Sequence, residues 1–169
     1  DAICYYQFDK KPFTFYMGAF PRKYAVADFP RILFQDSINN YRPVMNGIFW
    51  QIHNEINFIN VWLDWTSRQS ETRRETLMVG GSGRYKQGNF FLQAYGYYFH
   101  YARLMHPAEF QPLVDNAQML ASLGYLLEEN NYRPYIDLRL GWAIGFERER
   151  LDNIMRTPHG LLTEMKIGF

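Results

Sequence analysis

The sequence predicts an all-β fold, an antiparallel up-and-down transmembrane β-barrel with about eight or nine strands. Three observations support this prediction: apolar and polar residues alternate over long runs, 18% of the residues are aromatic, and turn-forming residues separate the runs. Aromatic side chains favour strands and are enriched where apolar and aqueous regions meet. No run of about 18 apolar residues occurs, so the sequence predicts no transmembrane helix.

The clearest strand covers residues 132–147. Alternate residues of this run are all apolar, among them Leu138, Leu140, Trp142 and Ile144, whereas the residues between them are charged or small. A period of two over this length predicts a membrane-spanning strand whose apolar side faces outward.

The same alternation, weaker in places, predicts further strands along the chain. They cover residues 2–8, 13–20, 45–53, 56–65, 73–79, 89–103 and 161–169. Residues 113–127 also alternate but are rich in helix-forming residues; a strand is favoured because a turn at 129–131 would then join it to the next strand. Residues 147–156 fit either a strand or a loop.

Turn-forming residues fall between these runs. The clearest turns are predicted at residues 39–40, 80–83, 129–131 and 157–160. Short connections between adjacent strands imply antiparallel hairpins. No linker, repeat or low-complexity segment divides the sequence, so residues 1–169 are interpreted as a single β-barrel domain or a contiguous part of one.

A soluble β-barrel or β-sandwich that binds an apolar or carbohydrate ligand is the alternative, because its strands alternate too. The membrane interpretation is favoured by the polar side of residues 132–147, where charges are mixed with Gly141, Ala143 and Gly145. Small residues suit a crowded barrel interior, and the unbroken apolar stripes of the opposite side suit lipid.

The run 161–169 alternates to its end and finishes on an aromatic residue, Phe169, and residues 40–47, 64–65 and 74–81 look family-like. Together with the period-two strands, these features resemble a porin-like outer-membrane β-barrel protein of Gram-negative bacteria. The resemblance implies a bacterial outer-membrane location, contact with membrane lipid, and a channel for passive passage of small hydrophilic solutes. It is also compatible with assembly of the chain into a homo-oligomer. Eight or nine strands suit a small closed barrel or a fragment of a larger one.

Several charged residues share the polar side of the predicted strands. Because an Arg or Lys that faces lipid at the bilayer centre costs about 2–4 kcal/mol, such residues should face the barrel lumen. The candidate lumen-lining residues are Asp64, Arg73, Glu75, Asp137, Arg139 and Glu147. They would either line an open channel that selects solutes by charge or form salt bridges that plug the interior.

No motif in the sequence carries recognisable chemistry. The histidines lack metal-binding spacing and Cys4 is the single cysteine, so neither a metal nor a cofactor is predicted. Nothing in the sequence brings Ser82, Ser122 and His100 together, so the chain is predicted not to be an enzyme. A net charge of +1 gives no reason to expect a nucleic-acid partner.

The tryptophans, Trp50, Trp62, Trp65 and Trp142, are expected to form an interfacial girdle, with sugar stacking as the alternative.

Overall fold

The computed structural model describes the chain except for residues 1, 35–37, 107–112, 129–134, 152 and 169. Nearly all regular structure in the described residues is β-sheet. The strands are β1 (Cys4–Lys10), β2 (Phe13–Pro21), β3 (Val44–His53), β4 (Phe58–Ser67), β5 (Thr76–Gln87), β6 (Phe90–Tyr101), β7 (Val114–Leu127), β8 (Tyr135–Glu149), β9 (Ile154–Arg156) and β10 (His159–Gly168). Two short helices, α1 (Lys23–Val26) and α2 (Ile38–Tyr41), lie between β2 and β3. No helix in the described part of the chain has the length and hydropathy needed to span a bilayer.

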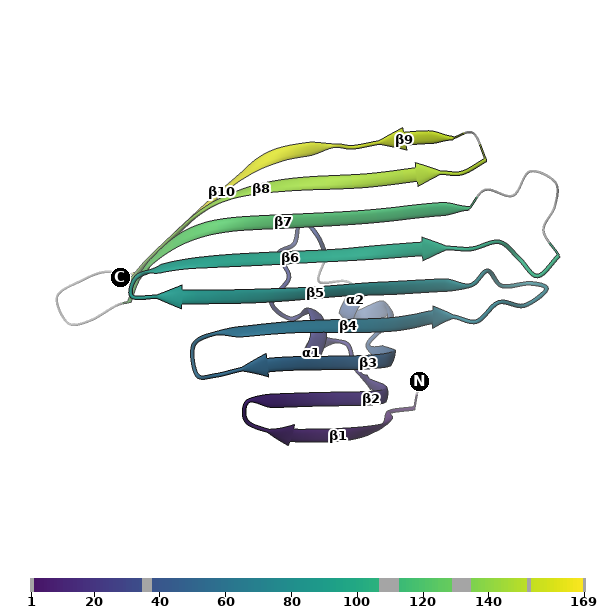
Figure 1. Ribbon diagram of the computed structural model, residues 1–169, viewed down its shortest axis with the longest axis horizontal. Helices are drawn as coiled ribbons and strands as arrows, with labels where there is room; N and C mark the ends of the chain where they lie inside the picture. Colours follow the sequence, from purple (N-terminus) through teal and green to yellow (C-terminus); the bar gives the residue numbers. More distant parts are fainter. Residues whose placement is uncertain (1, 35–37, 107–112, 129–134, 152, 169) are drawn as a thin grey trace.

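Each strand pairs antiparallel with its neighbour in the chain, from β1 to β8, and β8 pairs with β10 (Figure 1). β9 pairs with residues 147–149 of β8 and β10 with residues 135–144, so β9 and β10 together extend along one side of β8. This arrangement confirms the predicted antiparallel up-and-down fold. β1 and β10 are the two edges of the sheet, and no pairing between them occurs among the described residues. Closure into a barrel stays a prediction.

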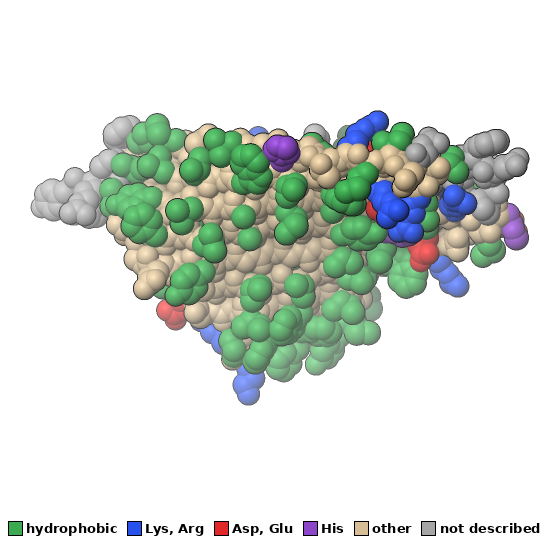
Figure 2. Space-filling model, turned by 45° about the horizontal axis from the view of Figure 1, so that its top comes forward, with side chains coloured by type: hydrophobic (Ala, Val, Ile, Leu, Met, Phe, Trp, Pro, Cys, Tyr) green, Lys and Arg blue, Asp and Glu red, His purple; other side chains and the backbone are tan. Residues whose placement is uncertain are grey.

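The two faces of the sheet have opposite character: the outer face is exposed and mostly apolar, whereas the inner face buries both polar and apolar side chains. On this outer face Leu140 is 53% exposed and Trp142 is 52% exposed, and Figure 2 shows hydrophobic side chains spread over the sheet. The inner face carries buried polar side chains, among them Asn60, Ser82, Gln93, Ser122 and Asp137. A soluble barrel would enclose its apolar stripes, so this polarity favours a wall that faces lipid.

An apolar segment that connects β2 to β3 packs against the inner face. Within it, the ring of Phe29 lies 6.0 Å from that of Trp62 and 5.2 Å from that of Tyr95, and the ring of Phe34 lies 4.8 Å from that of Tyr97. The buried apolar cluster joins this segment to side chains of β3, β4, β5, β6 and β7. We call residues 22–34 the inner segment; α1 lies behind the sheet in Figure 1.

A buried ion pair fastens the inner segment to β4. The Arg22 guanidinium donates a hydrogen bond of 2.5 Å to Asp64 Oδ2. Arg22 Nε also donates to the Arg42 carbonyl at 2.6 Å, and the backbone N–H of Asn46 donates to Asp64 Oδ1 at 3.0 Å. Both ends of the β2–β3 connection are therefore held beside Asp64.

From β1 to β7, the connections between consecutive strands differ in length at the two ends of the sheet. Residues 11–12, 54–57 and 88–89 form short connections at one end, which we call the turn end. Residues 22–43, 68–75 and 102–113 form longer connections at the opposite end, which we call the loop end. Outer-membrane barrels have short periplasmic turns and longer extracellular loops. This asymmetry predicts that the loop end is the extracellular end.

The structure confirms the two strand predictions that mattered most. Residues 135–149 form β8, with Leu138, Leu140, Trp142 and Ile144 exposed on the outer face. Residues 132–134 of the predicted strand lie outside the described residues. The stretch 113–127 is a strand rather than a helix, since β7 covers nearly all of it. The uncertain residues beyond 147 contain the end of β8 and all of β9.

Three of the predicted turns are wrong. Residues 157–160 form no chain reversal, because residues 157–158 join β9 to β10, which run in the same direction along β8, and residues 159–160 belong to β10. Residues 80–83 lie in the middle of β5, and the glycines among them leave room for neighbouring groups. A Cβ atom at Gly80 would lie 2.3 Å from Trp62 Cζ2, and one at Gly81 would lie 2.5 Å from the Asn60 carbonyl oxygen. Residues 39–40 belong to α2. The predicted turn at 129–131 lies outside the described residues.

Candidate functional site

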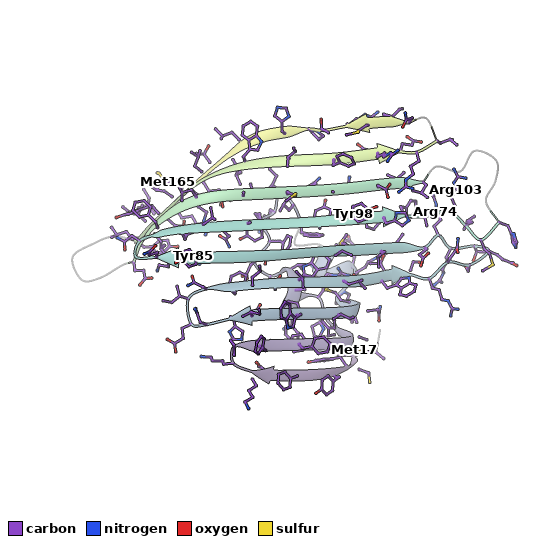
Figure 3. All side chains as sticks on the ribbon, in the orientation of Figure 1. Met17, Arg74, Tyr85, Tyr98, Arg103 and Met165 are labelled. Atoms are coloured by element: carbon purple, nitrogen blue, oxygen red, sulfur yellow. The ribbon has the colours of Figure 1, made fainter. Side chains whose placement is uncertain are left out.

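A polar cluster lies on the outer face at the loop end. His100 and Asp115 are cross-strand partners on β6 and β7. His100 Nδ1 lies 2.7 Å from Asp115 Oδ1, and the Tyr98 hydroxyl donates to the same oxygen at 2.6 Å. Arg150, just beyond β8, donates from Nε to Asp115 Oδ2 at 2.9 Å. Figure 3 shows Tyr98 near the loop end of β6.

Three donors thus converge on the Asp115 carboxylate. The Asp115 side chain is 5% exposed, whereas that of His100 is 26% exposed. A carboxylate only accepts hydrogen bonds, so Nδ1 of His100 carries the proton and Nε2 is the basic nitrogen. The result is an imidazole held in one tautomer, with no described side chain hydrogen-bonded to Nε2.

An apolar groove on the outer face begins at the strand next to His100. The groove has a volume of about 690 Å³. Its apolar lining includes Met17, Ala19, Ile48, Leu63, Trp65 and Leu77. Leu77 of β5 is also the cross-strand neighbour of His100. The imidazole therefore lies between an apolar groove on one side and a charged cluster on the other.

A hydrolytic site needs a base, a group that orients the base, and a nucleophile, and this arrangement provides the first two. A histidine held by a buried carboxylate is the base-and-orienting pair that activates a nucleophile in many hydrolases. No serine, threonine or cysteine in the described residues is hydrogen-bonded to His100. The geometry therefore suits activation of a water molecule by Nε2.

A second histidine contacts a hydroxyl at the turn end. Thr14 Oγ1 lies 3.2 Å from His53 Nε2 and donates to Asp9 Oδ1 at 3.0 Å. Here the carboxylate holds the hydroxyl and has no contact that orients the imidazole. Because the three residues come from β1, β2 and β3, we interpret this cluster as a cross-link between strands.

The serines considered in the sequence do not join His100. Ser82 and Ser122 are buried on the inner face, where Asn60 Nδ2 donates to the Ser82 hydroxyl at 2.9 Å. His100 lies on the opposite face, because it has the same parity in β6 as the exposed residues Phe90 and Leu92. The sheet itself separates these serines from the imidazole.

The predicted lumen-lining residues fall into two groups. Four are on strands: Asp64 pairs with Arg22, the Arg139 guanidinium donates to Asp137 at 2.7 Å, and Glu147 lies 3.6 Å from Arg156. These four side chains share the inner-face parity.

The other two precede β5. Arg73 is exposed in the connection 68–75, and Glu75, next to β5, lines the outer groove. A lumen-lining role for any of the six stays a prediction. Trp62 lies in the apolar core, whereas Trp50, Trp65 and Trp142 are exposed on the outer face. The described residues contain no cluster of three or more potential metal ligands.

Fold and cluster together define a class of protein, an outer-membrane-type β-sheet protein with an oriented histidine on its exposed apolar face. The chain belongs to the Lipid A 3'-O-deacylase-type family, whose model matches residues 2–108. Comparison with curated proteins gave no match, and comparison with solved structures also gave none.

The family overturns one prediction and refines another. The prediction that the chain is not an enzyme is wrong, because the family is named for a deacylase activity. The resemblance to an outer-membrane β-barrel protein agrees with this family, but a porin-like channel has no support from it. His100 lies inside the matched range and Asp115 outside it.

The sequence contains a signal for this cluster, the position of its residues in the alternating pattern. His100 and Asp115 both occupy the apolar parity of their strands, His100 with Leu92 and Asp115 with Met119 and Leu123. A polar group on the side that faces lipid is costly unless it has a partner or a function.

Proposed function

We propose that this protein is an outer-membrane esterase that removes an ester-linked acyl chain from lipid A. The observation that carries the proposal is the His100–Asp115 pair on the outer face, next to the apolar groove that begins at Leu77. An acylated sugar lipid has a polar head on one side of its ester carbonyl and an apolar chain on the other. His100 likewise has a charged cluster on one side, which suits the polar head, and an apolar groove on the other, which suits the acyl chain.

The position of the pair suits a substrate that is itself a membrane lipid. On the outer wall, His100 is accessible from the bilayer plane, so a lipid can approach without leaving the membrane. The longer connections at the loop end predict that this end is extracellular, and an extracellular position would put the pair at the level of the outer leaflet, where lipid A resides. The inner face offers no comparable access, since the inner segment packs against it.

In this mechanism His100 acts as general base and then as general acid. Nε2 takes a proton from water as the water oxygen attacks the acyl carbonyl carbon. The bond between that carbon and the sugar oxygen breaks, and the proton passes from Nε2 to the departing oxygen. The products are a fatty acid and a sugar hydroxyl. Asp115 holds the tautomer and stabilises the imidazolium, while Tyr98 and Arg150 hold Asp115.

Passive passage of small hydrophilic solutes is the second candidate function. The charged inner-face residues Asp137, Arg139 and Glu164 support it, because a polar lining attracts polar solutes. The inner segment opposes it, because Phe29 and Phe34 cover part of the same wall. We therefore rank this function below the esterase.

The test is release of fatty acid from lipid A by the refolded chain in lipid bilayers, followed by mass spectrometry. We expect His100→Asn to slow release by about 10²–10⁴-fold, the usual contribution of a general base. Asp115→Asn should also slow release, since it removes the tautomer control. His53→Asn is the matched control and should leave the rate unchanged.

Two results would contradict the assignment. A folded wild-type chain that releases no fatty acid from lipid A would reject the esterase function. Loss of activity in His53→Asn with normal activity in His100→Asn would move the active site to the turn end.

A further inference from the structure

Two arginines flank the candidate site on the β8 side. Arg148 of β8 is the cross-strand partner of Asp115, and its side chain is exposed on the outer face. Arg150 uses Nε to hold Asp115, and its side chain is 48% exposed. The two positions are one strand repeat apart and share the same face.

The charge of Arg148 is not balanced within the described part of the protein. No described carboxylate lies within ion-pair distance of Arg148; Asp115 binds Arg150 instead. Glu147 and Glu149, its neighbours in the chain, have the opposite parity, and Glu147 pairs with Arg156. The cluster of Arg148, Arg150, His100 and Asp115 therefore has an excess of positive charge.

An exposed guanidinium on a lipid-facing wall requires either water or an anionic partner. Its cost falls from about 2–4 kcal/mol at the bilayer centre to about 0–1 kcal/mol near the interface, so Arg148 belongs at headgroup level. Anionic headgroups are the available partners there. The planar guanidinium fork matches the geometry of phosphate oxygens and binds them through two parallel hydrogen bonds.

We propose that Arg148 and Arg150 form a phosphate-binding subsite that holds the phosphorylated sugar of the lipid substrate beside His100. This inference rests on the proposed esterase function and specifies its substrate. The subsite is on β8, the imidazole on β6 and the apolar groove on β2–β5, with adjacent strands about 4.8 Å apart. The substrate then lies across the strands, with its phosphate over β8 and its acyl chain over β5 and β4.

Arg148 is the residue to test, because Arg150 also holds Asp115 and its loss would disturb the base. The assay compares two lipids that differ only in the sugar phosphate, an acylated glucosamine phosphate and its dephosphorylated form. For the phosphorylated lipid, we expect Arg148→Gln to lower kcat/KM about 10- to 100-fold, mainly through KM, as loss of a charged hydrogen bond does. For the dephosphorylated lipid, Arg148→Gln and the wild type should be equal.

Two further variants sharpen the result. Arg148→Lys keeps the charge without the fork and should recover part of the loss. Arg68→Gln removes an exposed arginine just beyond β4, two strands from the strand of His100, and should behave as wild type on both lipids. Equal losses for the two lipids in Arg148→Gln, or no loss in either, would overturn the subsite.

A binding measurement separates this inference from the esterase function. Native mass spectrometry of the His100→Asn variant, with and without Arg148→Gln, reports retention of each lipid without turnover. Preferential retention of the phosphorylated lipid that disappears with Arg148→Gln supports the subsite even if the wild type is inactive. Equal retention of both lipids by the His100→Asn variant would reject it even if the esterase is active.

Discussion

Loss of the Asp64 carboxylate should destabilise the protein more than loss of any exposed ion pair. Asp64→Ala leaves the Arg22 guanidinium without its partner in a site where the two side chains are 2% and 1% exposed. It also removes the acceptor of the Asn46 backbone N–H. Removal of one partner of a buried ion pair costs about 3–5 kcal/mol. We expect the free energy of unfolding to fall by about that amount.

The double variant Arg22→Met with Asp64→Leu distinguishes the ion pair from simple loss of packing. Replacement of both charges by apolar side chains of similar size is often neutral or stabilising. We therefore expect the double variant to be more stable than Asp64→Ala, although it carries two changes. A purely steric role of Asp64 predicts the reverse order.

Urea unfolding in lipid bilayers, followed by tryptophan fluorescence, measures these differences. Trp62 contacts Phe29 and Phe34 of the inner segment, so its emission should change as that segment leaves the wall. A loss below about 1 kcal/mol in Asp64→Ala, the scale of a surface pair, would refute the reasoning. So would a double variant as unstable as the single one.

The remaining predictions concern the wall itself. Spin labels at Leu140 and Arg139 in bilayers should differ, with strong relaxation by oxygen at Leu140 alone, because the two side chains have opposite parity; equal accessibility would reject the lipid-facing assignment. Gly80→Ala should destabilise by about 1–3 kcal/mol because the new Cβ would overlap the Trp62 ring. Gly160→Ala, where a Cβ meets nothing within 4 Å, is the control and should be neutral in the same unfolding assay.

Period-two alternation predicted the strands because the two faces of this sheet have different surroundings. In β8, each step along the chain moves a side chain between an exposed apolar face and a packed polar one, so residues such as Leu138 and Asp137 cannot exchange. The same constraint made β7 recognisable although its residues also suit a helix. Where the two faces of a strand have such different surroundings, the alternation of apolar and polar residues is sufficient to predict the strand from local sequence.

The glycines of β5 show where local sequence is insufficient. A run of Gly80, Gly81 and Gly83 has the composition of a turn. The reason for these residues lies on β4, where the Trp62 indole covers Gly80 and the Asn60 carbonyl approaches Gly81. That contact depends on the pairing register of two strands, which the composition of one strand does not determine.

The candidate site was missed for a related reason. His100 and Asp115 are separated by 15 positions and a chain reversal, and only the β6–β7 register makes them partners. Ser82 and Ser122, the serines that could have served as a nucleophile, point inward, away from His100. The charged residues predicted to be functional mostly have the polar parity of their strands, whereas His100 and Asp115 have the apolar parity.

An interfacial anchor is the simplest other explanation of a polar cluster at the rim of a membrane wall, and the geometry argues against it. Anchoring residues extend toward water or headgroups and need no fixed partners. Asp115 is instead almost fully buried, and a phenol and an imidazole of β6 and a guanidinium just beyond β8 bind it. Such an arrangement gains little for anchoring, because it removes the carboxylate from water. It does fix the orientation and tautomer of His100, which is what acid–base chemistry on a neighbouring ester requires.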